Sequence, residues 1–163
     1  ILELAPTIMC LILAGKIGSN ISSEIGTMRI TEQIDALEIM GVNSASYLIF
    51  PKIVAALFTI PMIVIYSMFL GLVGGWVVGL YSGMLTVEDY LYGIRWDFKT
   101  FDVIYALIKT LFFAFIITSI PSYHGYYTRG GALEIGKSST KSVVYSSISI
   151  LVINYILTQL LLI

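Results

Sequence analysis

One segment of this chain has the spacing of a phosphate-binding loop. Residues 131–138 read GALEIGKS and fit the pattern G-x-x-x-x-G-K-[ST], in which backbone N–H groups and a lysine hold nucleotide phosphates. Such a loop needs a preceding strand, a following helix and an α/β domain with a magnesium-binding acid. Here long apolar segments flank it, so we expect Lys137 to bind no nucleotide.

The residue types needed for enzyme chemistry are sparse. The only histidine, His124, precedes a glycine and belongs to no HExxH or histidine–cysteine pattern. The only cysteine, Cys10, lies in an apolar run and has no partner for an internal disulfide. We therefore expect no catalytic residue and no metal site. The net charge of −1 also provides no basic face for nucleic acid.

Two charged residues lie in or beside apolar segments and allow a functional interpretation. Lys109 lies inside the apolar segment 103–123, and Glu3 lies at the start of another. A charge at membrane depth is costly, so it usually faces a cavity, a charged partner or a ligand. Alternatively, Lys109 extends its ammonium group to the membrane surface. The same alternatives apply to Lys16.

A short acidic segment, GTMRITEQIDALEIMG at residues 26–41, interrupts the apolar chain. Three of its apolar residues are spaced four and three apart and so share one helical face, while three acids lie off that face. These residues are Ile30, Ile34 and Leu37, and Glu32, Asp35 and Glu38.

This segment predicts a helix that contacts another protein. Thr31 can serve as its N-cap and Gly41 can end it, which leaves about nine residues, too few to cross a membrane. A helix lying on an anionic leaflet should be basic on its polar face. Because this polar face is acidic, a protein surface is the expected partner.

The elements that position these residues are expected to be membrane helices. The chain is 58% hydrophobic and 12% charged, against about 25% charged in soluble domains. A spanning helix needs about 20 largely apolar residues. We therefore predict an all-α integral membrane protein with spans at about 4–24, 53–81, 103–123 and 142–163, the second bent at Pro61.

The connecting segments predict the orientation. Segments 25–52 and 124–141 lie on one side of four spans, and 82–102 lies on the other. The first two carry five basic residues and the third carries two. The positive-inside rule then makes 25–52 and 124–141 cytoplasmic and 82–102 periplasmic.

Small residues recur at helical spacing in the first two spans. Such residues let membrane helices approach closely, although membrane helices are also rich in glycine in general. We predict helix packing at Gly15, Ser19, Ser22 and Gly26, and at Gly71, Gly75 and Gly79.

Several long blocks resemble the MlaE (YrbE) permease family of bacterial ABC transporters. The stretch ELAPTIMCLILAGKIGSNISSEIGTMRITEQIDALEIMG is similar to that family's ELGP, AGR-GS and TEQIDALE-MG blocks. LIKTLFFA and YHGYYTRGGALEIGKSSTKSVVYSSISILVINYILT resemble its last two helices and the loop between them. Ala5 replaces the usual glycine and Lys16 the usual arginine. The family has a further N-terminal interfacial helix and span, so the chain is expected to be N-terminally truncated.

The resemblance implies a multi-pass permease subunit of the bacterial inner membrane. It implies a homodimer, a separate cytoplasmic ATPase subunit that holds ATP and magnesium, and a periplasmic MCE-domain protein. This chain would then need no cofactor of its own. The complex would move phospholipid, or in some lineages sterol or another lipid, between the inner and outer membranes, while the direction of transport stays open. A non-transporting scaffold of an envelope complex is the alternative, and it would lack a lipid-sized cavity at the dimer interface.

The resemblance also implies roles for individual residues. Glu3 and Lys109 would lie on helices around the lipid cavity, and Arg129 and Gly130 would flank the ATPase contact. The coupling helix that docks on the ATPase would comprise Thr31, Glu32, Gln33, Ile34, Asp35, Ala36, Leu37, Glu38 and Met40.

Overall fold

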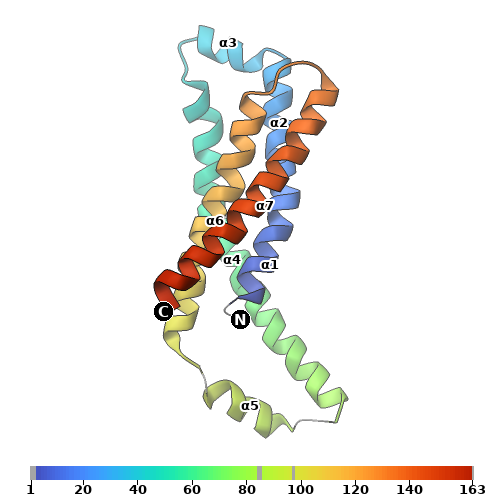
Figure 1. Cartoon of the computed structure of the whole chain (residues 1–163), viewed down its shortest axis with the longest axis vertical. Helices are drawn as coiled ribbons and strands as arrows, with labels where there is room; N and C mark the ends of the chain where they lie inside the picture. Colours follow the sequence, from blue (N-terminus) through green and yellow to red (C-terminus); the bar gives the residue numbers. More distant parts are fainter. Residues whose placement is uncertain (1–2, 84–85, 97, 163) are drawn as a thin grey trace.

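The computed structural model describes residues 3–83, 86–96 and 98–162. Residues 84, 85 and 97 of the predicted loop 82–102, and residue 163 of the last predicted span, lie outside the described residues. Throughout the described part, every regular element is a helix. Four helices are long and apolar enough to cross a membrane (Figure 1), which confirms the predicted all-α class.

The first membrane helix is continuous but contains a short π-helical turn. Two short helices, α3 and α5, lie in the connections between long helices. In chain order the elements are α1 (Leu4–Leu13), η1 (Ala14–Gly18), α2 (Ser19–Ile30), α3 (Gln33–Ile39), α4 (Ser44–Tyr81), α5 (Val87–Trp96), α6 (Thr100–Tyr126) and α7 (Ala132–Leu162).

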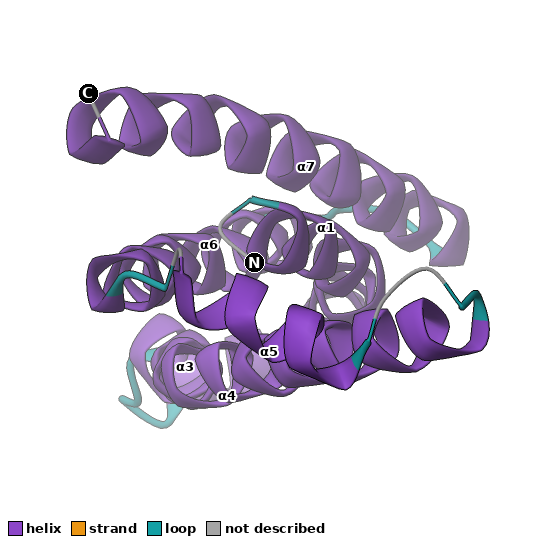
Figure 2. Cartoon of the chain, turned by 90° about the horizontal axis from the view of Figure 1, so that it is seen from below, coloured by secondary structure: helices purple, strands orange, loops and turns teal. Residues whose placement is uncertain are grey.

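The long helices form three layers. Figure 2 shows α1 and α6 in the middle, α7 on one side and α4 on the other. The core between them is apolar and draws one or more buried residues from each layer, including Cys10, Ile60, Phe113 and Ile150. Large apolar side chains also cover the outward faces of α4 and α7, as expected for helices that contact lipid.

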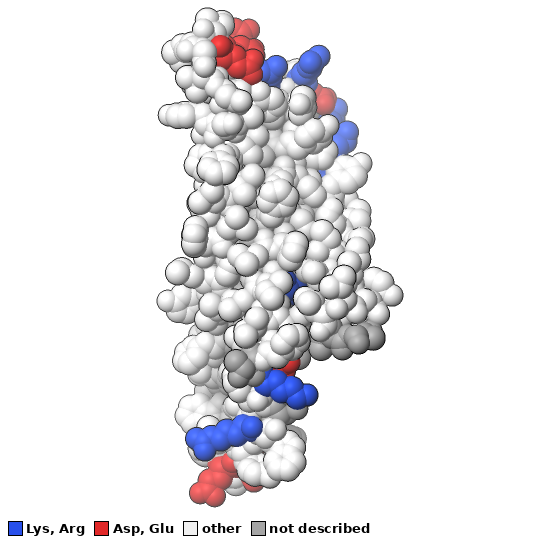
Figure 3. Space-filling model, turned by 90° about the vertical axis from the view of Figure 1, so that its left-hand side faces the viewer, with Lys and Arg blue, Asp and Glu red and all other residues white. Residues whose placement is uncertain are grey.

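Charged side chains gather at the two ends of the molecule. On the face drawn in Figure 3, the band between the ends is almost uncharged. The helix α3 and the turn between α6 and α7 lie at one end, and α5 lies at the other (Figure 1). The two segments predicted to be cytoplasmic therefore share one end, and their assignment to the cytoplasm stays a prediction.

The π-helical turn η1 determines which face of the first helix is buried. Buried residues recur there at every fourth position, whereas an unbroken α-helix would rotate every fourth residue by about 40° from the previous one. The wider π turn offsets part of this rotation. The positions at this spacing are Pro6, Cys10, Ala14, Gly18, Ser22 and Gly26, and Ile21 and Ile25 beside them are buried as well.

Within the chain, three of the four residues of the predicted packing stripe of the first helix contact a neighbouring helix or are buried, and Gly15 does not. Ser22 and Gly26 are buried as predicted. A Cβ atom on Gly15 would meet nothing within 4 Å. The Ser19 carbonyl accepts a hydrogen bond from the Ser139 hydroxyl of α7 at 3.1 Å, so this position contacts a neighbouring helix. Because η1 shifts the register by one residue, Ala14 and Gly18 occupy the buried face instead.

Glycines bring α2 and α6 into backbone contact. A Cβ atom on Gly125 would lie 2.7 Å from the Ser22 carbonyl oxygen and 3.1 Å from the Ile25 Cβ. Further along the same pair of helices, a Cβ on Gly18, the last residue of η1, would lie 3.1 Å from the Cγ of Pro121 in α6. The two helices can approach this closely only because these positions carry no side chain.

Two glycines of the α4 stripe, Gly71 and Gly75, have no neighbour on another long helix among the described residues. Gly71 faces open space, which corrects the prediction for that residue within a single chain. A Cβ on Gly75 would meet the Tyr90 hydroxyl of α5 at 3.1 Å, and Tyr90 donates to the Leu72 carbonyl at 2.7 Å. Gly79 is half-buried. This part of α4 therefore supports α5.

Candidate functional site

The helix α3 begins later than the sequence predicts. Thr31 is the C-cap of α2, and its hydroxyl donates to the Thr27 carbonyl at 2.8 Å. Glu32 follows in the left-handed region, with φ of 59°, and turns the chain into α3. The prediction of Thr31 as the N-cap is wrong because its hydroxyl caps the end of the preceding helix.

Gly41 ends α3 as predicted. Its φ of 78° is a conformation that glycine adopts without strain. The Gly41 N–H donates to the Glu38 carbonyl at 3.0 Å, and the Val42 N–H donates to the Leu37 carbonyl at 3.1 Å. This pair of bonds is a Schellman motif, which satisfies the last carbonyls of a helix.

The apolar face of α3 holds it against the bundle. Ile34 is completely buried and packs with Ile21 and Ile25 of α2. Ile30 and Leu37 are half-buried. The predicted apolar face is confirmed, with Ile34 as its anchor.

Two of the three predicted docking acids are engaged within the chain. Asp35 forms an ion pair with Arg29 at 2.7 Å. Glu38 accepts hydrogen bonds from the hydroxyls of Ser44 and Tyr126, each at 2.9 Å. Those two hydrogen bonds, with a smaller contribution from nearby Arg29, hold the pKa of the Glu38 carboxyl below its usual range. These acids therefore fix α3 to α2, α4 and α6.

What α3 presents outward is mostly apolar. We call its exposed residues other than Glu38, whose carboxylate is hydrogen-bonded within the chain, the α3 outer surface. Ile39 is 87% exposed and Met40 is 69% exposed. Ile39 was not predicted as a contact residue. The available signal was its position, because an isoleucine off the apolar face of an amphipathic helix indicates a second, exposed contact surface. The α3 outer surface consists of Glu32, Gln33, Ala36, Ile39 and Met40.

The second predicted contact lies at the same end. Arg129 and Gly130 are exposed in the turn between α6 and α7, and Gly130 has a φ of 117°. The Tyr126–Glu38 hydrogen bond joins the end of α6 to α3. The GALEIGKS segment is helical from Ala132 onward, so it lacks the loop conformation that holds phosphates.

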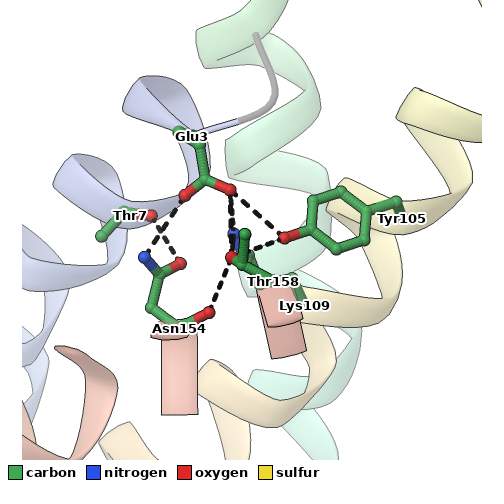
Figure 4. Close-up of polar contacts among 6 residues, drawn as sticks. All are labelled: Glu3, Thr7, Tyr105, Lys109, Asn154 and Thr158. Carbon is green, nitrogen blue, oxygen red and sulfur yellow. Dashed lines mark hydrogen bonds and ion pairs between the residues drawn. The ribbon is translucent and has the colours of Figure 1, made fainter. Parts of the chain in front are cut away.

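At the opposite end, Glu3 and Lys109 meet directly. The Lys109 ammonium donates to Glu3 Oε1 at 2.7 Å (Figure 4). The Lys109 side chain is completely buried, whereas that of Glu3 is 44% exposed. Of the two alternatives for Lys109, the structure shows the charged partner and not extension to the membrane surface.

A polar network surrounds this ion pair and joins α1, α6 and α7. Glu3 accepts hydrogen bonds from the Tyr105 hydroxyl at 3.2 Å, the Thr158 hydroxyl at 3.2 Å and the Asn154 amide at 3.3 Å (Figure 4). Sequence reasoning missed these partners. Their spacing was the available signal, because Tyr105 lies four residues before Lys109 and Asn154 four before Thr158, which places each pair on one helical face.

An apolar groove follows Glu3 along another face of α1. It lies between α1 and α4, has a volume of about 530 Å³ and is lined by residues including Leu4, Ile8, Ile12, Met68 and Gly71. Ligand sites commonly have volumes of about 300–1,000 Å³. A polar cluster beside an apolar groove suits an amphiphilic ligand.

Lys16 lies in a second groove, between α2 and α4, with a volume of about 540 Å³. Glu24 and Lys52 also line this groove and form an ion pair at 2.7 Å. Lys16 therefore faces a groove lined by both polar and apolar side chains at the surface of the described chain.

These features define the class of the protein. Four helices that are long and apolar enough to cross a membrane indicate a multi-pass membrane protein. The sequence profile of the MlaE permease family matches residues 1–160. The chain belongs to the MlaE permease family.

Individual relatives agree with this family. A probable ABC transporter permease protein of Rickettsia bellii is 43% identical over 97% of this chain and 61% of its own length. A probable ABC transporter permease protein of Synechocystis is 35% identical over 98% of this chain and 60% of its own. The chloroplastic Arabidopsis protein TRIGALACTOSYLDIACYLGLYCEROL 1 is 32% identical over 96% of this chain and 45% of its own. The chain thus spans about three fifths of the length of its bacterial relatives.

Proposed function

We propose that this chain is the core of a permease subunit that moves phospholipid between the inner and outer membranes of a bacterium. A separate ATPase subunit would supply the energy. The observation that carries the proposal is the Glu3–Lys109 cluster beside the apolar groove of α1 and α4, because a phospholipid has a charged head and apolar chains. The name of the Arabidopsis relative, which is that of a galactosyl diacylglycerol lipid, supports a lipid substrate.

The partners follow from the same proposal. The subunit forms a homodimer in the inner membrane and binds an ATPase through the α3 outer surface, which the Arg129–Gly130 turn flanks. It contacts an MCE-domain protein at the α5 end. The shape of α3 supports the ATPase contact. Internal bonds hold its position, while Ile39 and Met40 are left exposed for a partner.

Lipid occupancy tests the transport proposal. Mass spectrometry of the purified complex should find phospholipid enriched over the bulk membrane. Gly71→Leu should reduce that enrichment several-fold. Gly71 lines the groove and has open space at its Cβ position, so a leucine side chain there would fill part of the groove. Gly74→Leu is the matched control, since Gly74 also has open space but lies outside the groove lining. Absence of enrichment in the unaltered complex would favour the scaffold alternative.

Co-purification tests the ATPase contact. The double variant Ile39→Glu/Met40→Glu should reduce the ATPase recovered with the subunit by at least about tenfold, because exposed apolar anchors dominate such interfaces. These residues are preferable to Asp35 and Glu38, whose substitution would also break internal contacts.

The control for this experiment is Tyr81→Glu, which places a carboxylate at a 91% exposed position at the other end of the molecule. It should leave ATPase recovery unchanged. Equal recovery with the double variant and with Tyr81→Glu would show that α3 does not dock the ATPase through this surface.

A further inference from the structure

A third cavity is lined by residues at the end of α6, the start of α7 and the turn between them. Figure 1 shows that this turn lies at the end of the molecule that carries α3. Its volume is about 310 Å³, and three of its lining residues are the cations Arg129, Lys137 and Lys141. Glu134 is the only carboxylate among the residues that line it. The lining therefore carries an excess of positive charge.

Part of this charge is not paired with an acidic group in the part of the chain that the structure describes. Lys137 forms an ion pair with Glu134 at 2.7 Å. Among the described residues, neither Arg129 nor Lys141 has an acidic group within 4.0 Å. An arginine and a lysine that share a cavity in this way are suited to a phosphate group, which both bind through charge-assisted hydrogen bonds.

The wall of the cavity is held in a defined shape. The hydroxyls of Thr128 and Ser138 donate to the His124 carbonyl oxygen at 2.7 and 2.8 Å. The His124 ring stacks on Tyr145 with centroids 5.3 Å apart. These contacts join the end of α6 to the first turns of α7, so the cavity exists without a ligand to organise it.

The cavity lies at the depth expected for lipid phosphates. Residues 142–162 of α7 carry no charged side chain and span about 31 Å as a helix, which matches the hydrocarbon core of about 30 Å. Lys141 therefore lies at the boundary between hydrocarbon and headgroups. Tyr123 and Tyr127, which also line the cavity, are 61% and 62% exposed, as is common for tyrosines at this boundary.

An apolar surface leads away from the cavity along α7. Val144, Ile148, Leu151 and Tyr155 follow at intervals of four, three and four residues, and each is more than half exposed. They form a continuous helical face on which acyl chains can lie. A ligand that fits both the cavity and this face has a phosphate at one end and apolar chains at the other.

We propose that this cavity binds the headgroup phosphate of an anionic phospholipid, such as phosphatidylglycerol, in the leaflet at the α3 end. Arg129 and Lys141 are the phosphate ligands, and the exposed face of α7 carries the acyl chains. This lipid stays bound at the outside of the bundle and is distinct from transported lipid in the α1–α4 groove. The site does not depend on whether the subunit transports lipid.

The test compares the affinity of the subunit and its variants for a soluble phospholipid. The full-length subunit, purified in a neutral detergent, is titrated with dihexanoyl phosphatidylglycerol, and affinity is obtained from the rise in its unfolding temperature. Arg129→Gln/Lys141→Gln should lower the affinity by at least about tenfold, because two charge-assisted contacts are lost. Lys52→Gln removes a cation at the same end outside the cavity and should lower it much less.

Further arms separate the possible ligands. Dihexanoyl phosphatidylcholine, which has no net charge, and inorganic phosphate should both bind more weakly than phosphatidylglycerol. Arg129→Gln alone, in the exposed turn, serves if the double variant does not fold. The proposal is wrong if Lys52→Gln has the same effect as the cavity variant, or if inorganic phosphate binds as tightly as the lipid. It is also wrong if the cavity variant loses the ATPase but keeps its lipid affinity, which would identify a protein contact.

Discussion

Replacing Glu3 with glutamine should lower the free energy of unfolding of the subunit by about 3 kcal/mol, at the lower end of the cost of removing one partner from a buried ion pair. Glu3 is half-exposed, but Lys109 is completely buried, so the variant leaves an ammonium group inside the bundle without a counter-charge. Unfolding in mixed micelles with increasing sodium dodecyl sulfate measures the change.

Two further variants isolate the cause. Glu3→Gln/Lys109→Met removes both charges and should recover most of the lost stability, since no unpaired charge remains buried. Lys137→Gln breaks the Glu134–Lys137 pair, in which both side chains are about half exposed, and should change stability by less than about 1 kcal/mol. If Glu3→Gln and Lys137→Gln had equal effects, the Glu3–Lys109 pair would not stabilise the bundle.

Gly125→Val should also lower the free energy of unfolding strongly, because the valine side chain would enter the contact between α2 and α6. The Cβ alone would lie 2.7 Å from the Ser22 carbonyl oxygen, and backbone cannot move aside as a flexible side chain can. We expect a loss of about 3 kcal/mol in the free energy of unfolding, the upper end for overpacking. ATPase recovery should fall as well, because α2 leads directly into α3.

The matched control for this prediction is Gly136→Ala. Gly136 lies within α7 and has nothing within 4 Å of its Cβ position. Alanine there should be neutral or stabilise the helix by up to about 1 kcal/mol through its higher helix propensity. A Gly125 variant as stable as this control would mean that α2 and α6 are not in close backbone contact.

The helical architecture could be predicted because it depends on local composition. A run of about 20 apolar residues can satisfy its backbone in a membrane only as a helix or a closed barrel. The end of α3 was also predictable, since Gly41 acts through its own backbone conformation. Predictions that needed only neighbouring residues were largely correct.

The side-chain partners could not be predicted in this way. Glu3 and Lys109 are 106 residues apart, and no periodicity in either helix shows that they meet. Similarly, Asp35 and Glu38 look available for a partner until Arg29, Ser44 and Tyr126 are placed beside them. Which charges remain free for function is decided by tertiary contacts.

The π-helical turn η1 holds one residue more than the α-helical turn that it replaces. Each residue of an α-helix contributes about 100° of rotation. Without the wider turn, the extra residue would rotate everything before it by about that angle, and Glu3 would point away from Lys109. Deleting one residue from Ala14–Gly18 would therefore restore a regular α-helix and leave Glu3 facing Lys109. For this permease, the first helix can be one residue shorter at AGKIG and keep its polar partners on α6 and α7.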